Sequence, residues 1–173
     1  MRAVVIFMCF MFSMNFSYAN QTNDHESIDA VINAFKLSIQ EKNKARFLAL
    51  FVDVERPMIA VVDEVGYQKR KELVAQYNKE ENGNLIATRT FTVTPLKAID
   101  RKIKRSETSR QEILNIKTRT DGNIANVYFD YVFYVDGKKN NWGKESWQLV
   151  NTAAGWKISS VIFSIESKPI KDN

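Results

Sequence analysis

Cysteine and histidine are almost absent from this sequence. The 173 residues include one cysteine, Cys9, and one histidine, His25. Thiol chemistry, disulfide frameworks and cysteine-rich metal sites all need more cysteine than this. General acid–base catalysis by histidine is equally disfavoured, and any metal would depend on carboxylates. No Asp/Glu cluster has the spacing of metal ligands, so we expect no metal site.

Glycine is also scarce, with six residues that fall mostly in turns. The sequence contains no phosphate-binding glycine loop, no nucleophile elbow and no metalloprotease histidine pair. We therefore expect no cofactor.

The first 19 residues have the pattern of a secretory signal peptide. A positive residue, Arg2, precedes an apolar run that ends before Ser17, and small residues allow cleavage after Ala19. The run is shorter than the roughly 20 residues that span a bilayer, so we expect no stable membrane anchor. Because Cys9 lies inside this segment, the mature chain has no cysteine. We expect a periplasmic or secreted protein large enough to fold without disulfides.

The charge of the predicted mature chain is modest. Without Arg2 it has 24 basic residues against 20 acidic ones, which is a weak signal for nucleic acid, and we expect none as a partner. Basic residues gather between Asp100 and Arg110. This segment is predicted to be a solvated loop or hairpin tip, in preference to a contact for anionic lipid or polysaccharide.

Hydrophobic periodicity predicts helices first and strands afterwards. Helices are expected at 25–43, 44–51 and 66–80, with Ser27 as a cap, and a short strand at 58–64. After residue 83 the whole chain is predicted to form strands, at 85–94, 111–120, 124–135, 142–150 and 156–166. The pattern indicates an α+β fold with N-terminal helices packed on one face of an antiparallel sheet. One domain is expected at 20–173, with its core at 26–166.

Alternation along the strands predicts which side chains face the helices. In 124–135 the odd positions are apolar and predicted to face inward, whereas Tyr128 and Tyr134 face outward. Leu114 and Ile116 are expected to face inward on their strand. Glu145 shares a face with Trp147. The sequence leaves two environments open for Glu145: an apolar pocket that raises its pKa, or the solvent-exposed start of a strand, which we favour.

Two loose motifs resemble the nuclear transport factor 2-like superfamily, which includes SnoaL-like polyketide cyclases and ketosteroid isomerases. They are Leu50-Phe51-x-Asp53 at the end of the second helix and Trp156-Lys157-Ile158 opening the last strand. The resemblance implies a cone-shaped, cystatin-like roll in which a strongly curved sheet wraps the helices and leaves a pocket. The side chains expected to line it are Phe35, Phe129, Tyr131, Phe133, Trp147, Trp156 and Tyr67, and the two tryptophans are alternatively plain core residues.

The resemblance carries little of the isomerase chemistry. Isomerases of this superfamily place a Tyr on the first helix, an Asp base on the first strand and a second acid on the penultimate strand. The corresponding positions here are Phe35, the neighbourhood of Ile59 and Glu145. Asp63 is the acid nearest the base position. Glu145 and Asp63 are therefore the candidate catalytic residues, with Tyr131 as a possible assistant.

These observations favour an exported domain that binds a small apolar ligand or a protein partner without catalysis. One alternative is a lyase or isomerase acting on a small apolar substrate, with Glu145 as acid or base. Another is an assembly subunit that forms a homodimer through the outer face of its sheet.

Overall fold

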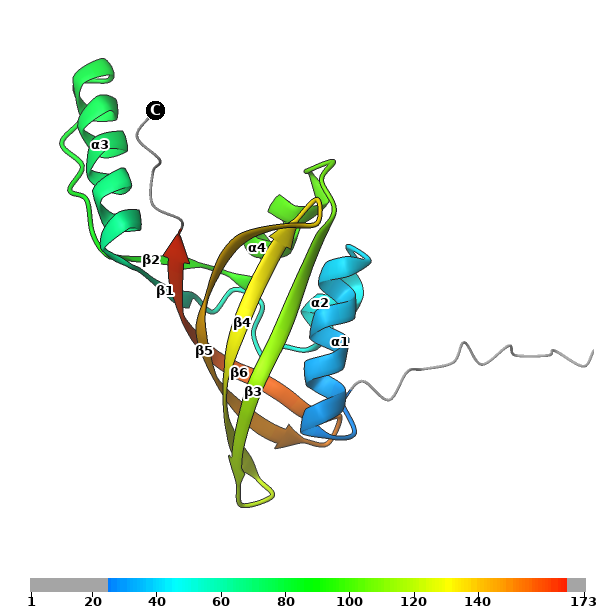
Figure 1. Ribbon diagram of the computed structural model, residues 1–173. Coiled ribbons are helices and arrows are strands. Elements are labelled where there is room, and N and C mark those ends of the chain that lie inside the picture. Colours follow the sequence, from blue (N-terminus) through cyan, green and yellow to red (C-terminus); the bar gives the residue numbers. More distant parts are fainter. Residues whose placement is uncertain (1–24, 168–173) are drawn as a thin grey trace, which may run out of the picture.

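The computed structural model describes residues 25–167, which form the helices and strands shown in Figure 1. In chain order these are α1 (Ile28–Gln40), α2 (Lys44–Ala49), β1 (Met58–Val62), α3 (Glu64–Glu80), β2 (Thr90–Val93), α4 (Pro95–Ile103), β3 (Ser109–Thr120), β4 (Ile124–Val135), β5 (Lys138–Thr152) and β6 (Gly155–Ser167). The predicted signal peptide lies outside the described residues. None of the helices in residues 25–167 is long and apolar enough to cross a membrane.

The six strands form one open sheet in the order β2-β1-β6-β5-β4-β3. Strands β3 to β6 are successive antiparallel neighbours, as the turn signals predict, but β1 pairs in parallel with β6. The predicted α+β class is confirmed. The sheet is mixed instead of wholly antiparallel because β1 and β6 are far apart in sequence, so no hairpin sets their relative direction.

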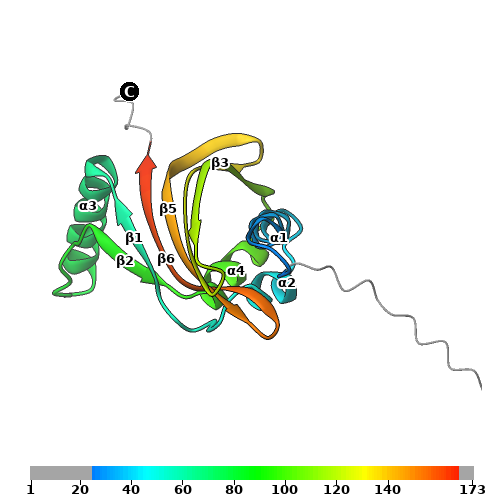
Figure 2. The ribbon, with the colours of Figure 1, turned by 90° about the horizontal axis from the view of Figure 1, so that it is seen from below.

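Strong curvature gives the sheet a concave face. Register shifts interrupt the β3/β4, β4/β5 and β5/β6 ladders, and such bulges bend a sheet and increase its twist. In Figure 2, α1, α2 and α4 lie on the side toward which the sheet curves. The core fills this space, with Phe35 and Ile39 of α1 packed with Phe129 and Trp147 from the sheet.

Helix α3 lies apart from the other helices, beyond β1 and β2 (Figures 1 and 2). It packs against β1 and β6, and Gly66 is its one buried residue. Its apolar residues Leu73 and Tyr77 are 66% and 48% exposed. Helix α3 therefore contributes little to the core that the other three helices share with the sheet.

Helix α4 corrects the prediction that only strands follow residue 83. Thr94 caps it by accepting a hydrogen bond from the backbone N–H of Lys97, and Pro95 occupies the first turn, where its missing N–H costs nothing. Ile99 is fully buried. The basic segment predicted as a loop therefore begins as the last turn of a helix, and strand β2 shortens to Thr90–Val93.

A bulge in β3 corrects the prediction for Leu114 and Ile116. Asn115 has a φ of 53°, and the β3/β4 register shifts between Leu114 and Lys117. Leu114 is 48% exposed and Ile116 is 45% exposed, whereas Ile113 packs against the core. The inward positions of β3 are thus the odd ones before the bulge, and they include Gln111.

Candidate functional site

A pocket of about 200 Å³ lies between the helices and the concave face of the sheet. Each element except α3 contributes to its lining. Its apolar walls include Phe35 and Ile39 of α1, Phe47 of α2, Met58 of β1, Val93 of β2 and Phe163 of β6. Lys102, Gln111, Tyr131, Asn141 and Glu145 add polar atoms to this apolar enclosure.

Glu145 is the buried acid of the pocket. It is 7% exposed and pairs across the sheet with Phe129 on β4 and Phe163 on β6. Burial raises its pKa from 4.5 to about 7, and the amide of Gln111, which donates to Oε2 at 2.9 Å, partly opposes that rise. The favoured expectation of a solvent-exposed Glu145 was wrong because Glu145 lies in the middle of β5, flanked by two strands.

Trp147 lies behind the pocket and does not line it. It is fully buried, with its ring edge-to-face against Phe35 at 4.8 Å and Phe129 at 4.9 Å between centroids. Within residues 25–167 its indole N–H has no hydrogen-bond partner. The indole N–H nevertheless acts on Glu145, whose pKa it lowers against the larger effect of burial. Phe129 and Trp156 are likewise core residues, so of the expected lining residues Phe35, Tyr131 and Phe133 are the ones that the structure places in the pocket.

The side chain of Tyr131, on β4, extends over β5 and contacts β6. Its hydroxyl donates to the backbone carbonyl of Ser164 at 2.8 Å, and burial, together with the nearby Glu145, raises its pKa. Gly143 makes this crossing possible: it lies opposite Tyr131, and a Cβ there would collide with the Ser164 carbonyl oxygen. The Tyr131 hydroxyl is therefore held by backbone, which leaves it poorly placed to assist Glu145.

Lys102 enters the pocket from the last turn of α4. Its Nζ lies 3.7 Å from the centroid of the Phe133 ring. Burial and the charge of Arg105 lower its pKa to about 8, against the opposing effect of Glu145. Sequence reasoning missed Lys102 because the segment was predicted as a loop. The Thr94-Pro95 pair, a typical helix start, was the signal that pointed to it.

Asp63 and Tyr67 lie outside the pocket, which corrects their predicted roles. Asp63 is the N-cap of α3, where its carboxylate accepts a hydrogen bond from the backbone N–H of Gly66 at 2.8 Å. Tyr67 lies one turn further, with the cationic groups of Lys71 and Arg89 about 5 Å from its ring centroid. The structure therefore does not bring Asp63 to Glu145 as a second acid.

The described part of the chain offers no group of three His, Cys, Asp or Glu side chains that could hold a metal ion. The polar residues of the pocket include one carboxylate, Glu145, alongside a cation and two amides. Such a set suits the polar end of an organic molecule better than a metal ion.

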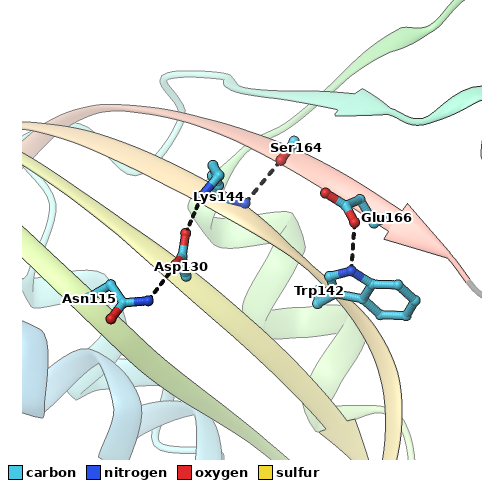
Figure 3. Close-up of polar contacts among 6 residues, drawn as sticks. All are labelled: Asn115, Asp130, Trp142, Lys144, Ser164 and Glu166. Atoms are coloured by element: carbon cyan, nitrogen blue, oxygen red, sulfur yellow. Dashed lines mark hydrogen bonds and ion pairs between the residues drawn. The ribbon is translucent and has the colours of Figure 1, made fainter.

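The outer face of the sheet carries a row of polar contacts (Figure 3). Asn115 on β3 donates to Asp130 on β4 at 2.7 Å, Asp130 forms an ion pair with Lys144 on β5, and the backbone N–H of Lys144 donates to the Ser164 hydroxyl. Nearby, the Trp142 indole donates to Glu166 at 2.6 Å. Homodimerisation through this face stays a prediction.

Comparison with known proteins identifies the fold. No protein-family profile and no curated protein matches the sequence. Among solved structures, a protein of unknown function from Mycobacterium tuberculosis, solved as a single-residue variant, is 12% identical with a TM-score of 0.54, over 80% of this chain and 69% of its own. A proposed scytalone dehydratase of Novosphingobium aromaticivorans is 12% identical with a TM-score of 0.54, over 84% and 92%.

A third similar structure is described as nuclear transport factor 2-like. It is an NTF2-like protein of unknown function from Pseudomonas putida, 8% identical with a TM-score of 0.52, and the match covers 79% of this chain and 82% of the other. At such low identity the likeness shows the fold alone. It confirms the resemblance predicted from the sequence motifs, and the chain therefore has the nuclear transport factor 2-like fold.

Proposed function

We propose that this protein is an exported domain that binds a small, largely apolar molecule in the pocket on the concave face of its sheet. The observation that carries the proposal is the open pocket of about 200 Å³ with apolar walls and a few convergent polar side chains. Sites of this composition hold a ligand by apolar contact and orient it with a small number of hydrogen bonds. The predicted signal peptide supports export.

Pocket volume limits the size of the ligand. An engineered apolar cavity of about 150 Å³ stays dry and binds benzene. A pocket of about 200 Å³ therefore suits one aromatic ring, or an aliphatic group of similar size, with a short polar substituent. Longer molecules would have to project through the opening.

Filling the pocket should weaken binding. Ala98 on α4 lines the pocket, and Ala98→Leu places extra carbon atoms inside it. Steric overlap is expected to weaken the binding of indole, a small aromatic probe, by at least about tenfold. Protein NMR shifts during an indole titration measure the effect. Ala45→Leu, at an exposed position of α2, is the control and should bind as the unmodified protein does. Equal affinity for both variants would exclude this pocket as the binding site.

A second candidate function is acid–base catalysis by Glu145. Its burial and a pKa of about 7 are the properties of a carboxyl that can both take up and release a proton near neutral pH. Neither proposed assistant is available to Glu145, because Asp63 caps helix α3 and the Tyr131 hydroxyl donates to a backbone carbonyl. Lys102 is the remaining charged group of the pocket.

This second candidate predicts a loss of proton transfer in Glu145→Gln. The probe is 2-tetralone in D₂O, whose protons next to the carbonyl exchange when a base removes them, as NMR records. If Glu145 acts as a base, the unmodified protein accelerates exchange and the variant slows it by about 100-fold or more. Glu112→Gln on β3, an exposed carboxyl, is the control. Exchange at the uncatalysed rate with the unmodified protein would leave binding as the function.

A further inference from the structure

Lys102 is a cation that the protein does not neutralise. Among residues 25–167 no carboxylate forms an ion pair with it, whereas other cations such as Lys44 and Lys144 have such partners. The charges that act on Lys102 are those of Arg105, which repels it, and Glu145, which attracts it. The close contact that its Nζ makes is with the face of the Phe133 ring, at 3.7 Å from the centroid.

The surroundings of Lys102 extend from the pocket into a second hollow. This hollow, of about 40 Å³, shares Lys102 and Phe133 with the pocket, and Arg105 and Ser109 also line it. Two cationic side chains, Lys102 and Arg105, thus line the hollow beside the apolar pocket. Glu107 lines the same hollow, but it is not among the charges that act on Lys102.

We propose that the ligand is a compact apolar monoanion, whose acidic group lies between Lys102 and Arg105 and whose apolar body fills the pocket. An anion at this position relieves the repulsion between the two cations and provides charge-assisted hydrogen bonds in a partly buried place. The proposal rests on the proposed binding function and adds the chemical class of the ligand, an aromatic or branched acid with one short acidic arm.

Glu145 couples this binding to pH. A ligand anion near Lys102 favours the neutral form of Glu145, so binding is accompanied by proton uptake near pH 7. The other titratable groups around the carboxyl are Lys102 from α4 and Tyr131 from β4. The affinity is expected to be higher at pH 6, where Glu145 is mostly neutral and Lys102 fully charged, than at pH 8.

The test compares phenylacetate with its uncharged isostere phenylacetamide by calorimetric titration. The unmodified protein is expected to bind phenylacetate about tenfold more tightly than the amide, since hydrogen bonds to charged groups are among the strong ones. Lys102→Met should remove this preference, and Lys102→Arg should keep most of it. Lys104→Met, at the exposed C-cap of the same helix, should leave it unchanged.

The possible outcomes separate this inference from the proposed function. If phenylacetamide binds as tightly as phenylacetate, the inference that the ligand is a monoanion is wrong, while the pocket remains a binding site. Binding of neither compound would count against both. A preference that survives in Lys102→Met would overturn the role of Lys102, provided that thermal melting shows the variant to be folded. Melting at or above the temperature of the unmodified protein is expected, because the variant loses a poorly solvated charge.

Discussion

Replacing Glu145 by glutamine is expected to increase the unfolding free energy relative to the unmodified protein more at pH 8 than at pH 4. In the folded protein the pKa of Glu145 is raised from 4.5 to about 7, so between these values the folded state holds a proton that the unfolded chain has released. The stability that Glu145 contributes is therefore present below pH 4.5, falls as the pH rises and is lost above pH 7. Across this range the change is about 3 kcal/mol.

Urea denaturation of both proteins from pH 4 to pH 8 measures this effect. The difference in unfolding free energy between Glu145→Gln and the unmodified protein isolates Glu145 from the other carboxyls, and it should grow with pH in favour of the variant. Glu112→Gln is a control of opposite sign. Hydrogen bonds from Arg110 and Tyr134 lower the pKa of Glu112, so its contribution is present at neutral pH and is lost as the pH falls. A pH-independent difference for Glu145→Gln would refute the raised pKa.

The sequence predicted the order of elements well where local signals determine them. The hairpin turns at Asp121-Gly122 and Asp136-Gly137 place β3, β4 and β5 as expected, with both glycines at positive φ. Ser27 caps α1 as predicted. The parallel pairing of β1 with β6 depends on contacts between distant segments, and no local pattern indicates it.

The candidate site was predicted in part. Strict alternation places Tyr131 and Phe133 of β4 on the face that lines the pocket, and Glu145 of β5 on the face of Trp147. The burial of Glu145 itself was not the environment that we favoured. The lining residues on α4 and β3 were missed for two different reasons. Lys102 depended on recognising a short helix in a basic segment, and Gln111 depended on the β3 register, which the bulge at Asn115 shifts. A bulge changes which residues face inward without any change in composition.

Separating core from lining also exceeds what alternation can do. Trp147 and Glu145 share the inner face of β5, yet one lies behind Phe35 and the other lines the pocket. Whether an inward side chain meets another side chain or open space depends on the helix above it. The distance between the strand and that helix depends on how α1 and α4 pack, and the alternation of residues along the strand does not indicate it.

Truncation of Trp147 is the second large effect that we expect. Its ring joins Phe129 of β4 to Phe35 of α1. Phe35 contacts Phe47 at 5.4 Å between ring centroids, and Phe47 contacts Phe51 at 5.2 Å. This aromatic chain connects the sheet to the two N-terminal helices. Trp147→Ala removes the ring that links Phe129 to Phe35, from a fully buried position, and should cost about 3 to 5 kcal/mol of unfolding free energy.

Trp142→Ala is the matched control for this prediction. Trp142 lies on the same strand, is partly exposed and donates its indole N–H to Glu166, so its loss should cost only about 1 kcal/mol. Urea denaturation monitored by circular dichroism compares the two variants without relying on the fluorescence of the remaining tryptophans. Equal losses would contradict the packing role of Trp147.

Ligand binding by Trp147→Ala then distinguishes support of the pocket from direct contact with the ligand. Trp147 does not line the pocket, but it packs behind Phe35, which does. Its removal leaves Phe35 free to move toward the vacated space, so indole binding is expected to weaken although no direct contact is lost. Ala98→Leu acts in the opposite way, since it fills the pocket from the helix side and leaves the aromatic chain in place. A variant that loses stability but keeps full affinity for indole would mean that α1 holds Phe35 without help from the sheet.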